Sequence, residues 1–245
     1  ADGITVPWPG DAGLIMGVTE VYVVGADDVT SNRATLRPTG GLGFMSVSDD
    51  VGPFVAAFEA NIPADANRMV ARINLGETGL KSIHETVTSI DGTRVYAAVE
   101  CGTAGDPWGG IAVIDAMTMT QVDEDLVTPG DNFIQLPGNA DALGVAMSPS
   151  GDFLYVADAG GAVHVIDVRP DSGDFHRVVQ TIQIATDRRL AGALAVGADG
   201  RRLYVAVSAE SELGGEIAVV NVDPADRPAD TSVDLSDTTA NPRYW

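Results

Sequence analysis

A histidine and a carboxylate stand side by side at His84 and Glu85. An imidazole can transfer protons near neutral pH or bind a metal ion, and a neighbouring carboxylate can assist either task. One histidine and one carboxylate do not complete a metal site, because such sites take three or four protein ligands. The alternative is a polar pair that lines a channel without chemistry, and this is the interpretation that we expect.

Arg188 and Arg189 are two consecutive basic residues in a chain that is otherwise strongly acidic. Guanidinium groups bind carboxylates and phosphates through paired hydrogen bonds, so these two residues are candidates for holding an anionic ligand. The alternative is that they form salt bridges with neighbouring Asp and Glu residues. The sequence favours the salt bridges.

Trp108 lies in the segment 102–110, which is longer than a hairpin requires and is expected to be a loop. An exposed Trp in a loop suits contact with a protein partner, because its ring offers a large apolar surface. The alternative is a Trp folded back over the edge of a sheet, which we expect.

The remaining reactive side chains have structural interpretations. His164 falls in an expected strand with a partly exposed face, His176 follows a turn near Asp174 and is expected to be exposed, and Cys101 is expected to be a partly buried thiol at a strand end. A single cysteine excludes an intramolecular disulfide, a four-cysteine zinc site and a C-x-x-C-H haem site. The sequence has no Gly-x-Ser-x-Gly, Walker or Rossmann motif, so we predict no catalytic residue and no metal ligand.

The net charge of the chain restricts the classes of partner that it is expected to bind. Its 245 residues include 14 Lys and Arg against 35 Asp and Glu, a net charge of −21. Nucleic-acid phosphate and anionic lipid repel such a chain, so neither is an expected partner. The acidity indicates a solvated surface suited to a saline or extracellular setting. Calcium binding is the alternative, but no loop has the EF-hand spacing, so we expect no cofactor.

Two further features bear on the setting of the chain. No run of about eighteen apolar residues is present, which excludes a membrane-spanning helix. The chain begins at Ala1 without an initiator methionine, which indicates a processed mature form or an excerpt of a longer protein.

The stretch 148–168 shows which elements position these side chains. Two apolar runs, 153–157 and 162–168, flank a short connection rich in glycine, and a third run at 143–147 precedes them. Val, Ile, Tyr and Phe dominate the runs, while Gly, Pro, Ser and Asp dominate the joints. This pattern predicts consecutive antiparallel strands joined by hairpin turns.

The same sequence pattern, apolar runs joined by a turn that contains glycine, recurs along the chain. The turn glycines Gly52, Gly92, Gly151 and Gly200 are 40, 59 and 49 residues apart, and each is followed by an apolar run. A period of about 40–50 residues with several strands per repeat is typical of propeller blades. Further strands are expected at 21–25, 34–37, 44–47, 54–58, 69–75, 83–88, 120–127, 133–136, 178–184, 193–196, 203–207, 217–222 and 232–235.

The repeated phrase, S-P-x-G-x-x-[LV]-Y-V-A followed by G-x-[IV]-x-V-[IV]-[DN]-[VL], resembles the YVTN family of β-propeller repeats over residues 41–235. The resemblance implies a propeller. It does not choose a function, because members of the family include surface proteins, lactonase-like enzymes and subunits of quinoprotein dehydrogenases. The shared residues are strand and turn residues, so no catalytic residue is carried over.

We therefore predict an all-β fold, a β-propeller of four-stranded antiparallel blades with about five repeats visible. Residues 41–245 form the blades, and residues 1–40 form irregular strands, a degraded blade or a closing segment. Residues 241–245 resemble the start of another repeat, so the blades are expected to form an open arc that another chain segment covers. Closure of a small ring by residues 4–37 is the alternative, as is membership of a larger propeller.

The expected function is a non-enzymatic interaction or scaffold module at a secreted, periplasmic or cell-surface location. Its partner would be another protein or another segment of a larger chain. The alternative is a propeller enzyme or enzyme subunit, which would use channel-facing residues. The residues eight positions before the four turn glycines are expected to face this channel. They are Phe44, His84, Leu143 and Gly192, and only His84 is titratable.

Overall fold

The computed structural model describes residues 19–21, 34–36, 42–59, 69–76, 79–103, 106–122, 133–184, 190–207, 216–223 and 243–244. Within these ranges the regular structure is antiparallel β-strand, with one 3-10 turn, η2, at Pro137–Asn139. The predicted all-β fold is confirmed. The described part of the chain contains no helix able to span a membrane.

Four antiparallel sheets follow one another in sequence, beside a small pair formed by β1 (Thr19–Val21) and β2 (Ala34–Leu36). The first sheet comprises β3 (Leu42–Ser48), β4 (Pro53–Glu59) and β5 (Met69–Ile73). The second comprises β6 (Ser82–Thr88), β7 (Arg94–Thr103), β8 (Asp106–Asp115), β9 (Thr120–Val122) and β10 (Phe133–Gln135). The third comprises β11 (Ala142–Met147), β12 (Phe153–Asp158), β13 (Ala162–Asp167) and β14 (Arg177–Gln183). The fourth comprises β15 (Leu190–Val196), β16 (Arg202–Val207), β17 (Glu216–Asn221) and β18 (Arg243–Tyr244).

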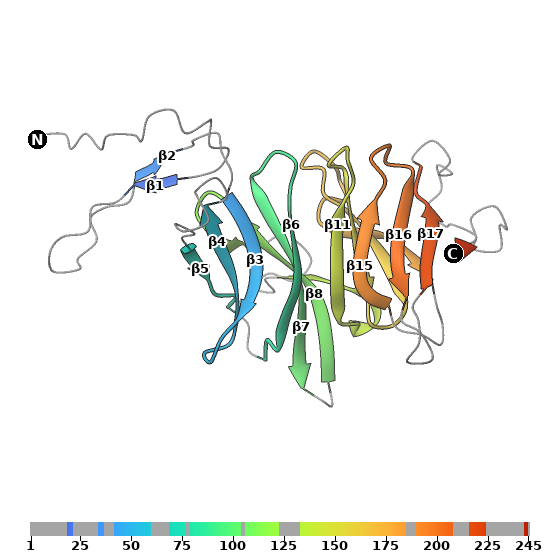
Figure 1. The fold of residues 1–245 in the computed structure, drawn as a ribbon, viewed down its shortest axis with the longest axis horizontal. Coiled ribbons are helices and arrows are strands. Elements are labelled where there is room, and N and C mark those ends of the chain that lie inside the picture. The colour runs from blue at the N-terminus through green and yellow to red at the C-terminus, as the bar shows by residue number, and fades with distance from the viewer. Residues whose placement is uncertain are drawn as a thin grey trace, which may run out of the picture.

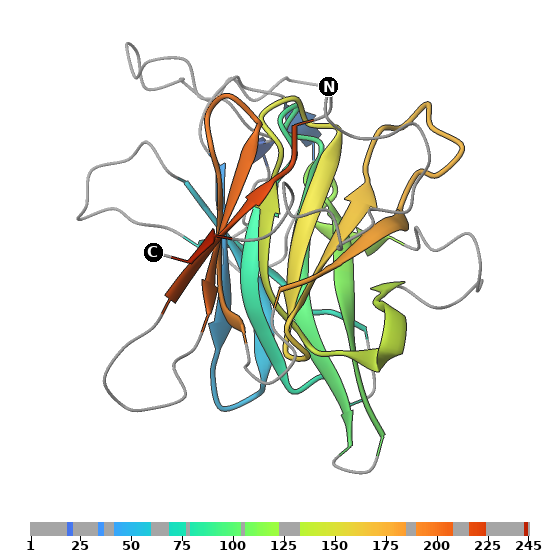
Figure 2. The same ribbon diagram turned by 90° about the vertical axis from the view of Figure 1, so that its right-hand side faces the viewer.

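The sheets stand face to face in a row, with the first and fourth at its two ends (Figure 1). Their opening strands β3, β6, β11 and β15 lie side by side in that order. Seen along the row, the sheets are turned relative to one another like the blades of a fan (Figure 2). This is the blade arrangement that the repeats predict, and among the described strands it forms an arc.

Both faces of an inner sheet are apolar because a sheet lies on each side of it. The hairpin registers give Val55, Tyr96, Tyr155 and Tyr204 equivalent places in the second strands. Val55 packs between the first and second sheets, Tyr96 between the second and third, and Tyr155 between the third and fourth. Burial on both faces explains why these strands lack the alternation of a half-exposed sheet.

The predicted turn glycines hold positive backbone φ in the hairpins that open the blades. Gly92, Gly151 and Gly200 have φ of 69°, 79° and 70°, a region where a Cβ is strained. Each also donates its N–H to the carbonyl of the residue three positions earlier, at 2.8–2.9 Å. The repeat therefore reproduces one turn geometry three times.

Three expectations about elements need correction. The expected loop at 102–110 is a hairpin instead, since β7 and β8 pair through to Thr103 and Asp106. The expected strand at 120–127 ends at Val122 in the described residues. Arg243 and Tyr244 pair with β17 as a fourth strand and do not start another repeat. The expected strand at 232–235, most of that at 21–25, and the irregular strands expected before residue 19 lie outside the described residues.

Candidate functional site

His84 and Glu85 sit at the β-bulge between Ile83 and Thr86 in β6, and they have different partners. His84 Nε2 lies 3.4 Å from Glu100 Oε2 in β7, with about a third of the His84 side chain exposed. Glu85 Oε2 instead accepts the Val145 N–H at 3.0 Å. Glu85 thus connects the second sheet to the third, and the hydrogen bonds direct the two side chains to separate places.

This arrangement predicts unequal effects of the two alanine substitutions. Glu85→Ala should lower the free energy of unfolding by about 1–3 kcal/mol, because it leaves the buried Val145 N–H without its acceptor. His84→Ala should change it by under about 1 kcal/mol, since it removes only a partly exposed contact with Glu100. Urea denaturation of the two variants measures the difference, and equal effects would contradict the assigned role of Glu85.

The middle of the arc is held by contacts between opening strands. Ser46 Oγ donates to the His84 carbonyl at 2.9 Å, and Thr86 Oγ1 donates to the Phe44 carbonyl at 3.1 Å. Gly144 in β11 lies directly against the Gly192 carbonyl of β15. These positions therefore serve packing between blades.

The other candidate residues do not join His84. Trp108 lies in β8, half-buried, with its ring edge-on to Phe133 at a centroid distance of 5.4 Å. It lies opposite Cys101, which is fully buried within β7 and not merely partly buried at a strand end. Arg188 and Arg189 lie outside the described residues.

A cleft of about 500 Å³ opens between the second and third sheets, at the end of β6 opposite His84. Three connections surround it: the β6–β7 turn, the β11–β12 turn and the β13–β14 loop. The carboxylates among its lining residues are Asp91, Asp152 and Asp171, and the cations are Arg94 and Arg169. Ile90 is 62% exposed at the opening. We call this the inter-sheet cleft.

One wall of the inter-sheet cleft is fixed by Asp91. Its Oδ1 accepts Ser89 Oγ at 2.6 Å, the Thr93 N–H at 3.0 Å and Thr93 Oγ1 at 2.9 Å. Partial burial raises the pKa of Asp91, but these hydrogen bonds and the nearby Arg94 outweigh it, so the pKa is lowered. Asp91 is therefore ionised at neutral pH.

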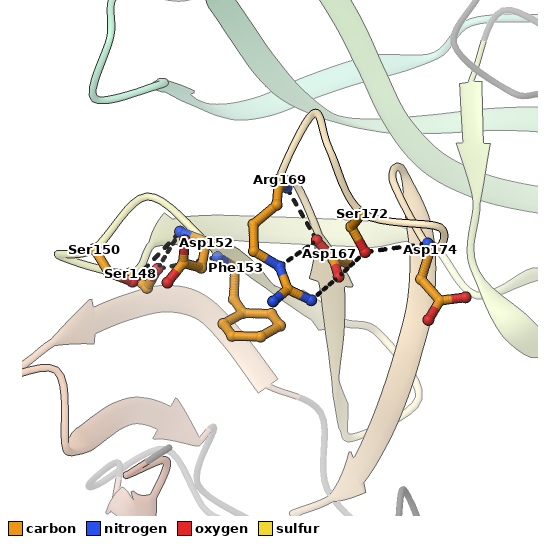
Figure 3. A network of polar contacts seen from close by, with 8 residues as sticks. All are labelled: Ser148, Ser150, Asp152, Phe153, Asp167, Arg169, Ser172 and Asp174. Atoms are coloured by element: carbon orange, nitrogen blue, oxygen red, sulfur yellow. Dashed lines mark hydrogen bonds and ion pairs between the residues drawn. The ribbon is translucent and has the colours of Figure 1, made fainter. Parts of the chain in front are cut away.

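The opposite wall is organised by Asp167, shown in Figure 3. Its carboxylate accepts the Arg169 N–H at 2.9 Å, Arg169 Nε at 3.1 Å and Ser172 Oγ at 2.8 Å. The Arg169 guanidinium also lies 5.3 Å from the centre of the Phe153 ring. Burial raises the pKa of Asp167, but the bonds from Arg169 and Ser172 outweigh it and lower the pKa.

The floor of the inter-sheet cleft connects the two sheets through an aromatic cluster. Tyr96 Oη lies 3.1 Å from His176 Nε2, and the two rings meet edge to face. Phe175 stacks on His176 at 3.7 Å. His176 is 4% exposed, so its expected exposure is wrong. Its partner Tyr96 lies 80 residues away in sequence, which local pattern does not reveal.

His164 is also buried, at 1% exposure, and its expected partly exposed face is wrong. Its Nε2 lies 2.8 Å from Asp158 Oδ2, and its Nδ1 lies 3.0 Å from Thr181 Oγ1. Asp158 Oδ1 accepts the Ala162 N–H at 2.7 Å. Although this set resembles a catalytic triad in composition, its members lie inside the third sheet, where they join β12, β13 and β14.

The lowered carboxyl pKa values predict acid sensitivity. Hydrogen bonding by Arg72 lowers the pKa of Asp49 to about 2, and the pKa values of Asp91 and Asp167 are also below the ordinary 3.8. Their contribution to stability is complete above about pH 4 and is lost as the pH falls through the lowered values, because the unfolded chain protonates first. Urea denaturation between about pH 5 and pH 2 should show this loss as a fall in the free energy of unfolding. That free energy should depend less steeply on pH in the Asp167→Asn variant. An unchanged slope in that variant would contradict the assignment.

The described residues contain no cluster of three His, Cys, Asp or Glu side chains able to hold a metal ion. What the inter-sheet cleft offers is a fixed arrangement of ionised and aromatic groups. Such an arrangement suits recognition of a chain segment by charge and apolar contact.

The fold defines a β-propeller-like protein, and comparison with known structures agrees. A lactonase-like protein from Bacteroides uniformis, assigned as a 6-phosphogluconolactonase, matches with a TM-score of 0.50 and 18% identity, over 85% of this chain and 62% of that chain. Sqt1 from Chaetomium thermophilum, bound to the N-terminus of ribosomal protein L10, matches with a TM-score of 0.47 and 18% identity, over 86% and 55%. Kuenenia stuttgartiensis hydrazine synthase matches at 0.44 and 17%, over 84% and 58%.

The chain thus spans less than two thirds of each of these structures. No protein-family model matches the sequence, and no curated protein matches it. The likeness to the Bacteroides uniformis structure, at a TM-score of 0.50 and 18% identity, supports the propeller fold and leaves the activity open.

Proposed function

We propose that this chain is a non-enzymatic propeller of YVTN type that binds protein segments in the inter-sheet cleft. The observation that carries the proposal is the cleft itself, whose two walls belong to different sheets and are fixed by their own hydrogen bonds. A preformed surface binds a flexible segment at a lower entropic cost than a loop that must be ordered.

The chemistry of the cleft indicates the kind of segment. Its lining carries three carboxylates and two guanidinium groups, and Arg169 is already paired with Asp167. The partner that complements it carries Lys or Arg next to an apolar residue, which would meet Ile90 and Phe175. The net charge of −21 would also speed the encounter with a basic partner.

Selection from a random peptide display library against the whole chain tests this proposal. We expect enriched peptides to combine a basic residue with an apolar one. Asp171→Lys should weaken binding of the enriched peptide by at least about tenfold, because it places a cation at the rim. Asp50→Lys is the matched control, since it makes the same charge change on an exposed turn of the first sheet.

Three outcomes would overturn the proposal. The first is the absence of enriched peptides, and the second is enriched peptides whose binding Asp171→Lys and Asp50→Lys affect equally. The third is lactone hydrolysis by the chain that is lost on replacing both His84 and Glu85 with alanine, which would favour an enzyme. A secreted, periplasmic or cell-surface location is part of the proposal and rests on the acidity of the chain.

A further inference from the structure

The face of the fourth sheet turned away from the third is open and apolar. It carries Ala193 and Ala195 on β15, Tyr204 and Ala206 on β16, and Ile217 and Val219 on β17, and we call these six residues the end face. The strand registers place Tyr204 opposite Val219 and Ala206 opposite Ile217. Tyr204 is 39% exposed and Ile217 is 49% exposed.

Equivalent positions in the preceding sheets are completely covered. Tyr96 and Tyr155, which occupy the place of Tyr204, are each 1% exposed. Ile111 and Val163, which occupy the place of Ile217, are each 0% exposed. The end face therefore continues an established series of inter-sheet contacts, and it has the residue types that the series buries.

The charge of the end face differs from that of the chain as a whole. The chain has a net charge of −21, yet among the described residues on this face of β15, β16 and β17 the only charged side chain is Arg202. A second copy of the same face would consequently meet it without carboxylates opposed to carboxylates.

We infer that the end face binds the end face of a second copy of this chain, around a two-fold axis. The face combines two large side chains, Tyr204 and Ile217, with three alanines. The large side chains of one copy can therefore pack against the alanines of the other. A head-to-tail contact is less suited, because Phe54 and Ala56, on the outward face of the first sheet, are already 4% and 5% exposed. The end face shares no residue with the inter-sheet cleft, so this inference is independent of peptide binding.

Sedimentation velocity of the whole chain over a range of concentrations and salt tests the inference. We expect a dimer, and we expect salt to strengthen it, because screening weakens the repulsion between two acidic chains. Ile217→Asp and Tyr204→Asp should each weaken the dimer by at least about tenfold. Val51→Asp is the control, since Val51 is 82% exposed in the β3–β4 turn and should not affect dimerisation.

Thermal melting followed by circular dichroism of each variant shows whether the monomer remains folded. A monomer at every concentration and at high salt would overturn the inference. So would a dimer that persists in folded Ile217→Asp and Tyr204→Asp chains, or one that Val51→Asp weakens equally.

Discussion

Gly144→Ala is expected to destabilise the protein by more than about 3 kcal/mol or to prevent its folding. A Cβ at Gly144 would lie 1.4 Å from the Gly192 carbonyl oxygen, far inside van der Waals contact. The obstructing atom belongs to the backbone of β15, so no side-chain rotation can relieve the clash. The third and fourth sheets would have to move apart along their opening strands. Urea denaturation followed by circular dichroism measures the loss.

Gly173→Ala is the control for this prediction. Gly173 lies in the exposed β13–β14 loop, its backbone φ is not positive, and nothing lies within 4 Å of its Cβ position. Its substitution should change the free energy of unfolding by under about 0.5 kcal/mol. Similar stabilities for the two variants would show that β11 and β15 are not in contact at Gly144.

Asp158→Ala should cost about 2–5 kcal/mol of stability, because it leaves two buried hydrogen-bond donors without their acceptor, at about 1–3 kcal/mol each. The Asp158 carboxylate accepts hydrogen bonds from two groups, the Ala162 N–H and the His164 ring. Both Asp158 and His164 are under 5% exposed, so water cannot replace the lost acceptor. Chemical denaturation measures the loss directly.

A double-mutant cycle with His164→Ala separates the pair from the rest of the network. We expect the double variant to be more stable than the sum of the single losses predicts, since the two residues interact. Asp199→Ala is the matched control, because Asp199 also accepts a turn N–H, that of Arg201 at 3.1 Å, but is exposed. Additive losses at Asp158 and His164 would refute the coupling.

Local pattern is sufficient for most blade strands and for the turns at Gly92, Gly151 and Gly200. Gly151 marks a hairpin because positive φ favours glycine, and the flanking Val, Tyr and Phe residues mark strands, so both features are visible in a short window of sequence. Continuous apolar runs such as 153–157 are also the pattern that burial on both faces produces, and neighbouring sheets cover both faces of this strand.

The candidate site was less predictable, because its contacts join distant segments. His176 was expected to be exposed, but its burial depends on Tyr96 in another sheet. His164 was expected on a partly exposed face, but Thr181 and Asp158 enclose it. The inter-sheet cleft was missed altogether. The one available signal was the charged turns of successive repeats, Asp91 and Asp152, which stacking of the sheets brings to one side.

The face-to-face row of sheets determines where the molecule opens first. Among the described strands each sheet is built from consecutive strands, and its face-to-face contacts are with its immediate neighbours. In such a stack stability is a sum of terms between neighbours, so opening at one end need not spread along the row. In the monomer, amide hydrogens of the third sheet, enclosed on both faces, should exchange with solvent more slowly than those of the fourth, whose end face is open. The protein would then come apart from its ends inward and not all at once.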